Sequence, residues 1–364
     1  MMTSVGIEIN KQYVKLAVVN KGTKHLDCFA GSVESFTDEQ VIQKIIDMLR
    51  GQKIKAKGVT LCLSRDSVTV RNLHLPSRST KEIAQMIDLH IARVVPYKKE
   101  EIVFSHQFLG ADEMGYARVL LAIVQIEVIR RLARILEKAG LFVEQISFSS
   151  WGLWQWVNKN CHAQITQGEM HIILDVDSLF SDFIIFSQQG FLFTRSIGIG
   201  SSSIRQSSQQ GLVKLIGELK QSLVIFYNEE INKKPVKIFL SGATDIPNFP
   251  ASLEAELGIP VKAVPAAHLR EGLNSLPTDA SLNALAGVAL AGEEKGLSFI
   301  LPEIQIKKSI RDKTRELIIV GSFTVYILFL SCAIFLGKIY NQQAYLRRLT
   351  QNYGRIERQM GDLM

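Results

Sequence analysis

The segment from Leu317 to Gly337 constrains the chain most, because its 21 residues contain no charged side chain. At about 1.5 Å of rise per residue, a helix of this length covers the roughly 30 Å hydrocarbon core of a bilayer. A helix buried in a globular core rarely runs this long without a charge and with charge clusters at both ends. The sequence therefore predicts one transmembrane helix over residues 317–337.

The charges on either side of this segment predict its orientation, because basic residues close to a span are retained in the cytoplasm. More of them precede the span than follow it: Lys307, Lys308, Arg311, Lys313 and Arg315 against Lys338, Arg347 and Arg348. Residues 1–11 contain Glu8 and lack the basic and apolar regions of a signal peptide. We therefore expect a cytoplasmic N-terminal domain and an extracytoplasmic C-terminus.

The composition excludes several classes of protein. The formal net charge of +7 belongs largely to the juxtamembrane residues 296–316, where it suits anionic lipid, and no motif of an RNA-binding module appears. Four cysteines without Cys-x-x-Cys spacing argue against a disulfide scaffold and favour a reducing compartment. The loose group Cys161, His162 and His171 fits no common zinc spacing, so no metal is expected.

Residues 338–364, beyond the span, show apolar positions alternating at spacings of three and four. These positions are Ile339, Gln342, Leu346, Leu349, Tyr353, Ile356, Met360 and Leu363. Such a heptad seam is typical of a helix that pairs with another helix, and it predicts a dimer through this segment. A solvated amphipathic extension without a partner stays open, because Gly354 and Gly361 weaken the helix.

The region before residue 296 shows two similar halves, about 1–165 and 166–295. Each starts with a predicted hairpin of apolar strands, Val5–Val19 in the first and Met170–Phe186 in the second. Helical spacing follows at Thr37–Arg50, Thr80–Val94, Glu127–Ala139, Leu212–Asn228 and Asn248–Leu257. These patterns predict a duplicated α/β fold of mixed sheets with helices on their faces.

Several motifs in this region resemble a known family. They are Leu73–Pro76, Pro96–Glu101, Phe191–Gly200, Leu240–Ala243 and Leu257–Val261. With the order of the two hairpins, they resemble the superfamily of actin, the heat-shock chaperone ATPases and FtsA, and more narrowly its PilM and GspL branch. Residues 296–302 are similar to the start of PilN. The resemblance implies an actin/FtsA-like fold in an inner-membrane platform protein of type IV pili or type II secretion.

The resemblance also implies where a nucleotide would bind, at Gly6, Glu8, Asn10, Asp175, Asp177 and Gly242. In the superfamily, the backbone of each hairpin turn approaches the phosphates and carboxylates hold Mg²⁺ through water. Here Asp177 replaces the phosphate-facing glycine, where it would repel phosphate and obstruct close approach of the backbone. We expect a degenerate pocket with no bound ATP and no catalytic residue, while an ATP-binding switch or ATPase stays open as the alternative.

Other features predict structure and not chemistry. No Walker A motif occurs, and Gly198–Ser203 is predicted to be a plain turn, because it lacks the third glycine of a dinucleotide fingerprint. Trp151, Trp154 and Trp156 are predicted to lie on a helix packed on the core between the two halves. An FtsA-like filament protein is disfavoured, because that family attaches to membranes by an interfacial helix and not by a span.

Residues 296–302 join the cytosolic domain to the basic juxtamembrane residues. In the PilM and PilN pair that this chain resembles, a short apolar peptide of one protein docks in a cleft of the other, and here both lie on one chain. Leu297, Phe299, Leu301 and Pro302 are therefore expected to dock against the domain, with a plain linker as the alternative. The implied partners are a cytosolic motor ATPase and bitopic platform proteins of the PilN/PilO or GspM type. The sequence does not distinguish a pilus from a secretion system.

Overall fold

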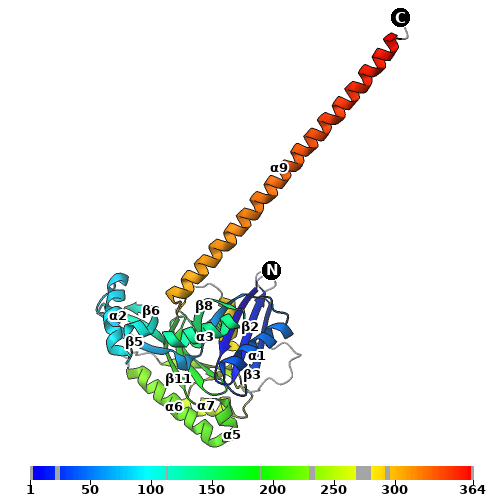
Figure 1. The fold of residues 1–364 in the computed structure, drawn as a ribbon. Helices are drawn as coiled ribbons and strands as arrows, with labels where there is room; N and C mark the ends of the chain where they lie inside the picture. The colour runs from blue at the N-terminus through cyan, green and yellow to red at the C-terminus, as the bar shows by residue number, and fades with distance from the viewer. Residues whose placement is uncertain are drawn as a thin grey trace. The chain divides into compact units, whose positions relative to one another are not determined.

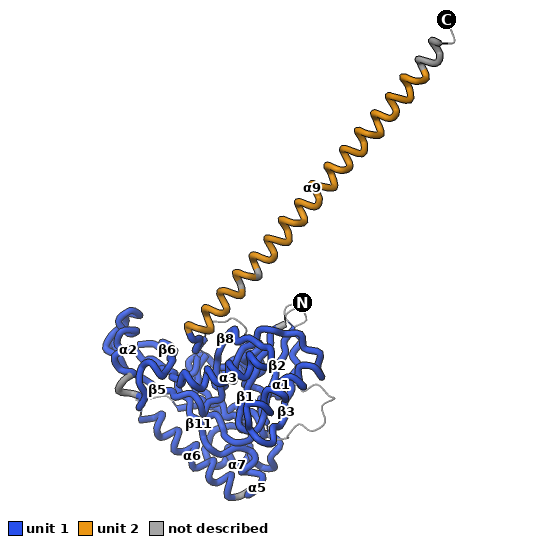
Figure 2. The backbone as a smooth tube through the Cα atoms, viewed as in Figure 1, with its two compact units in different colours: residues 1–301 blue, residues 302–364 orange. Residues whose placement is uncertain are grey.

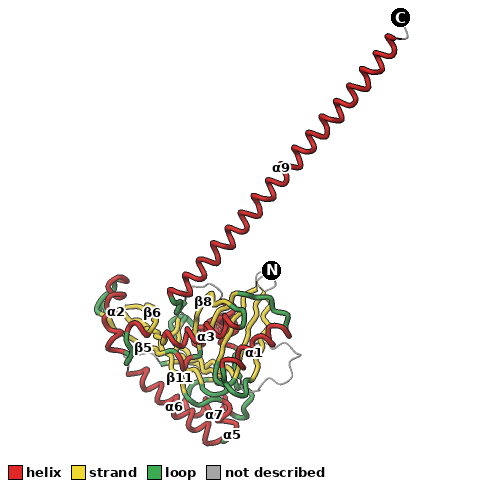
Figure 3. The backbone as a smooth tube through the Cα atoms, viewed as in Figure 1, coloured by secondary structure: helices red, strands yellow, loops and turns green. Residues whose placement is uncertain are grey.

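The computed structural model describes most of the chain as two compact units, residues 1–301 and residues 302–364 (Figures 1 and 2). The described residues are 3–20, 25–111, 114–188, 190–228, 234–267, 280–291 and 296–361. The first unit carries mixed sheets and helices, and the second is one long helix (Figure 3).

The first half of the first unit is built on a five-stranded sheet in the order β3-β2-β1-β4-β8. Its strands are β1 (Thr3–Ile9), β2 (Tyr13–Asn20), β3 (His25–Ser32), β4 (Gly58–Leu63) and β8 (Phe142–Phe148). The first three form an antiparallel meander, whereas β4 and β8 add in parallel beside β1. Parallel neighbours need crossover connections, which α1 (Asp38–Gly51) and α3 (Ile126–Lys138) supply.

The second half repeats this topology in the order β11-β10-β9-β12-β13. Its strands are β9 (Met170–Val176), β10 (Ser181–Ser187), β11 (Gly190–Ile197), β12 (Pro235–Gly242) and β13 (Val261–Ala263). Again three antiparallel strands precede two parallel ones. Its helices are α5 (Ser201–Gln206), α6 (Ser208–Asn228) and α7 (Phe249–Leu257). The duplicated α/β fold expected from the two hairpins is confirmed.

A small layer is inserted between β4 and β8. It contains the antiparallel sheet β5-β7-β6 and helix α2, with β5 at Thr69–Leu75, α2 at Thr80–Val94, β6 at Ile102–Ala111 and β7 at Ala117–Gln125. One face of α2 buries Ile83, Ile87 and Ile91 against this sheet. Short 3₁₀ turns lie at Arg65–Ser67 (η1), Lys99–Glu101 (η2) and His162–Gln164 (η3). The strands of this layer were not predicted from the sequence.

Two central helices, α4 (Ser149–Cys161) and α8 (Asn283–Ala291), pack against each other. They cross at Gly152 and Gly287, where a Cβ on Gly287 would lie 1.8 Å from the carbonyl oxygen of Gly152. A methyl group at either position would therefore force the two backbones apart. Trp151 and Trp156 of α4 are buried, as expected for a core helix.

The predicted helices agree with the structure to within one residue, except at α6, which starts at Ser208 and not at Leu212. The expectation of a plain turn over Gly198–Ser203 is wrong, because α5 begins at Ser201. The N–H groups of Ser201 and Ser202 donate to the carbonyls of Asp177 and Ser178 at 2.8 and 3.1 Å. These bonds satisfy the first orphan amides of the helix from outside it, which the polar serine run does not reveal.

The second unit is helix α9, which runs from Pro302 to Gly361 without a break. Proline suits this first position, because its fixed φ fits a helix and its missing N–H would lack a partner there in any case. By length and composition, α9 is a candidate membrane-spanning helix, and none of its apolar window is buried. The seam residues Ile339, Leu346 and Tyr353 are exposed along it, whereas the predicted seam residue Leu363 lies outside the described residues.

Candidate functional site

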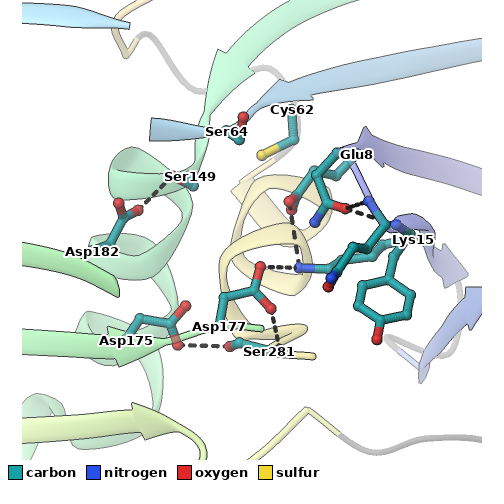
Figure 4. Close-up of polar contacts among 12 residues, drawn as sticks. Glu8, Lys15, Cys62, Ser64, Ser149, Asp175, Asp177, Asp182 and Ser281 are labelled. Carbon is teal, nitrogen blue, oxygen red and sulfur yellow. Dashed lines mark hydrogen bonds and ion pairs between the residues drawn. The ribbon is translucent and has the colours of Figure 1, made fainter. Parts of the chain in front are cut away.

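The candidate site lies where the hairpins of the two halves face each other (Figure 4). The structure places Glu8 in β1, Asn10 in the turn after it, Asp175 in β9 and Asp177 directly after β9. It brings Glu8, Asp175 and Asp177 into one buried cluster. Gly6 does not belong to the turn: it lies within β1, where a Cβ would meet Leu285 and Ala289 of α8 at 3.1 and 3.4 Å. Gly6 therefore has a packing role.

Lys15 of β2, which the sequence analysis did not single out, is the centre of this cluster. Its Nζ donates to Asp177 Oδ2 at 2.7 Å and lies 3.4 Å from Glu8 Oε1, and the residue is 1% exposed. Burial opposes the charge of the ammonium, but the carboxylates of Asp177 and Glu8 outweigh it and raise the pKa of Lys15. The sequence signal that could have identified this residue is a lysine within an otherwise apolar strand. Removing one partner of such a buried pair costs about 3–5 kcal/mol.

The carboxylates around Lys15 are held by the polypeptide itself. The N–H of Ser281 donates to Asp177 Oδ1 at 2.7 Å, and its hydroxyl donates to Asp175 Oδ1 at 2.6 Å. Burial raises the pKa of Glu8 to about 7 and that of Asp175 to about 6, although Lys15 opposes the first shift and the serine hydroxyl groups on Asp175 oppose the second. The cluster contains the buried carboxyl groups of Glu8, Asp175 and Asp177 around the ammonium group of Lys15.

The backbone amides of the two turns are also engaged within the chain. Asn10 Oδ1 accepts from the N–H groups of Gln12 and Tyr13 at 3.0 and 2.8 Å, and the Asn10 N–H donates to the Tyr13 carbonyl. In the second turn, the N–H of Asp177 donates to the Phe180 carbonyl at 3.1 Å. A phosphate cradle needs free amides pointing at the anion. These four amides point elsewhere.

Gly242, the last predicted pocket residue, has a structural requirement of its own. Its φ is +83°, and a Cβ there would lie 2.2 Å from the carbonyl oxygen of Val176. Only glycine allows the end of β12 to pass this close to the end of β9. The late Leu-Ser-Gly turn of the sequence therefore positions Ser241, which donates a hydrogen bond to Asp175.

A second buried polar cluster joins the same two halves. Ser149 of α4 donates to Asp182 of β10 at 2.5 Å, and the guanidinium of Arg65 donates to the hydroxyl and carbonyl of Thr194 in β11 at 3.0 and 2.7 Å. Burial raises the pKa of Asp182 to about 8 and lowers that of Arg65 to about 10. Among the residues that the structure describes, no group of three or more His, Cys, Asp or Glu side chains could hold a metal ion.

Residues 296–301 belong to the first unit and lie against β8 in an extended course. Leu297, Phe299 and Leu301 are buried, Phe299 completely, while Ser298 between them is exposed. The N–H of Phe299 donates to the Ile146 carbonyl at 3.3 Å, and its ring packs edge-on against Phe148 at 5.9 Å. Full burial of a side chain of this size is worth about 1.5–3 kcal/mol. Pro302 begins α9 and lies in the second unit.

The duplicated topology, with its central site filled by internal ion pairs, defines a protein of the actin-like α/β class. Residues 6–212, more than half of the chain, match the family described as type IV pilus assembly protein PilM. The chain belongs to this family. No curated protein matches it.

The chain is similar to two solved structures, of which the first shows the same fold. The "PilM-PilN type IV pilus biogenesis complex" is 17% identical, with a TM-score of 0.66, over 80% of this chain and 99% of the other. The cytoplasmic domain of EpsL, described as an inner membrane component of the type II secretion system of Vibrio cholerae, is 10% identical, with a TM-score of 0.47, over 81% of this chain and 97% of the other.

The raised pKa of Asp182 predicts a pH dependence of stability. The folded state holds protons on Asp182, Glu8 and Asp175 that the unfolded chain releases above about pH 4, so the free energy of unfolding falls as the pH rises from about 4 to 8. Asp182→Asn should reduce the slope of the free energy of unfolding against pH by the contribution of about one proton. Denaturant titrations of the solubilised chain at several pH values, followed by tryptophan fluorescence, would measure this slope. Asp245→Asn, which removes an exposed ion pair with Arg205, should keep the slope. An unchanged slope in Asp182→Asn would contradict the assignment.

Proposed function

We propose that this chain is a non-enzymatic scaffold in the inner-membrane platform of a type IV pilus or type II secretion machine. In this role it links a cytosolic motor ATPase to membrane and extracytoplasmic platform components. Family membership supports the machinery, and the candidate spanning helix α9 supports the membrane location. The similarity to the PilM-PilN complex supports a bitopic partner of the PilN type.

The single observation that carries the non-enzymatic part is the Lys15–Asp177 ion pair. The lysine that could bind a phosphate is neutralised at 2.7 Å by a carboxylate of the chain itself. A nucleotide would have to break this pair and bring further negative charge beside Glu8 and Asp175, in a region of low dielectric. These groups favour an empty pocket over a switch or ATPase.

Isothermal calorimetry tests this directly. The wild-type chain should give no binding heat with Mg·ATP up to millimolar concentration, because the carboxylate of Asp177 already neutralises Lys15. Asp177→Gly is the matched variant, since it removes the closer carboxylate from the lysine. Micromolar binding by the wild type would favour the nucleotide switch.

Co-purification of a secretion ATPase and a second bitopic protein from solubilised membranes would test the scaffold role, and their absence would count against it.

The same proposal includes an orientation for α9. We infer from the basic residues before the apolar window that the first unit is cytoplasmic and that residues 338–364 lie outside. Leu297, Phe299 and Leu301, which lie directly before α9, are buried in the first unit.

A topology reporter tests this orientation. An enzyme active only outside the cytoplasm should be active when fused after Met364 and silent when fused after Gly296, because only the first fusion lies beyond the span. A fluorescent protein that matures only in the cytoplasm is the matched control and should give the opposite pattern. Reversal of both patterns would refute motor docking by the first unit.

We further propose that two copies of α9 pair in parallel. Counted back in heptads from Ile339, the seam continues through Phe335, Cys332, Leu328, Val325, Gly321 and Ile318, all within the apolar window. The positions flanking the seam between Ile339 and Tyr353 carry Gln343, Tyr345, Thr350 and Asn352, so no like charges meet between two copies. Arg347, Arg348 and Arg355 lie on outer positions.

Native Cys332 reports this pairing without an engineered cysteine, because the other three cysteines are buried. Oxidation of membranes containing the chain should give a disulfide-linked dimer that Cys332→Ser abolishes. In that background, Ser331→Cys places the thiol beside the seam and should cross-link much less. Equal cross-linking at 331 and 332 would show random collision and not a defined seam.

A further inference from the structure

The buried ion pair spans the two halves of the first unit. Lys15 lies on β2 of the first sheet, whereas Asp177 follows β9 of the second, and their polar atoms are 2.7 Å apart with both side chains buried. The N–H of Ser281 also holds Asp177, directly before α8. Separation of the halves would leave both charges buried without a partner or would need water to enter, so the pair opposes separation strongly.

Other contacts tie the second half to the first near the docked segment. Arg65 of η1 holds Thr194 of β11 by two hydrogen bonds, and Ser149 of α4 donates to Asp182 of β10. These contacts fix β11 relative to η1 and β10 relative to α4.

The surface under the docked segment belongs to the first half, and Phe191 of the second half packs behind it. Phe299 packs edge-on against Phe148 at 5.9 Å, and Phe148 packs against Phe191 of β11 at the same distance. Trp151 lies 6.1 Å from Phe191, and a Cβ on Gly296 would meet the Trp151 ring at 2.3 Å. Movement of the second half would withdraw Phe191 and alter the positions of the two rings that Phe299 and Gly296 contact.

We propose that the Lys15–Asp177 ion pair acts as a latch that keeps the two halves in the arrangement to which residues 296–301 dock, so that closure of the halves and docking are thermodynamically coupled. The coupling is reciprocal: undocking should loosen the latch by the same free energy by which opening the latch weakens docking. The inference rests on contacts within the first unit and does not depend on the proposed scaffold role. Calorimetry and co-purification can fail while the coupling holds.

Hydrogen exchange of the full chain in nanodiscs tests the forward direction. Asp177→Asn and Lys15→Met should each speed exchange of the Ser298 and Phe299 amides at least tenfold. In these variants the halves would open more often, and each opening would release residues 296–301 from their docked position. Asp245→Asn is the matched control, since its ion pair with Arg205 lies within the second half. Its exchange over residues 296–301 should equal that of the wild type.

The reverse direction uses Cys62 of β4, a thiol that is 1% exposed beside Glu8 and close to the latch (Figure 4). Phe299→Ser should increase the rate of Cys62 alkylation, located by mass spectrometry, several-fold. Cys28, which is buried on β3 opposite Ala17, is the internal control for unfolding of the first sheet and should react at an unchanged rate. This arm needs no change in the latch, so it decides the question even where the charge variants fail to fold.

Two results would overturn the coupling. The first is unchanged exchange of residues 296–301 in folded Asp177→Asn or Lys15→Met. The second is an unchanged rate of Cys62 alkylation in Phe299→Ser when its residues 296–301 exchange as fast as a free peptide. A parallel rise of Cys28 and Cys62 alkylation would show global unfolding in place of a latch and would also refute the proposal.

Discussion

The ammonium group of Lys15 is the interaction on which the arrangement of the first unit depends. An isolated cation without water is strongly unfavourable, so the two hairpins must bring carboxylates to it from both halves. Asp177 makes the close contact, and Ser281 orients that carboxylate from the start of the second central helix. The chain itself therefore supplies the anion that joins its two halves.

The resemblance to the actin superfamily predicted part of the site. It implied one pocket for Glu8, Asp175 and Asp177, and the structure brings these three residues together. The role of Lys15 was not predicted, because a single lysine in a strand can face either solvent or the core. Only the contact with the distant Asp177 shows that it faces the core. The role of Ser281 was not predicted for the same reason, since it depends on a contact across more than a hundred residues.

The fold shows the same division between local and distant information. Helices with a regular apolar face, such as α2, are recognisable because their period is local. Helix α5 was not predicted, because its first amides donate to carbonyls of the second hairpin and the serine run does not indicate these partners. The alternation of Leu297, Phe299 and Leu301 indicated an extended buried segment, but only the structure identifies Phe148 and Ile146 as its neighbours.

The crossing of Gly152 and Gly287 has a consequence for how this chain can change in evolution. A side chain on either glycine would meet the backbone of the other helix, so no single substitution there is absorbed by a neighbouring rotamer. Since α4 belongs to the first half and α8 to the second, this contact makes the duplicated halves unable to drift independently. A larger residue at either glycine would therefore require a compensating backbone shift in the other half.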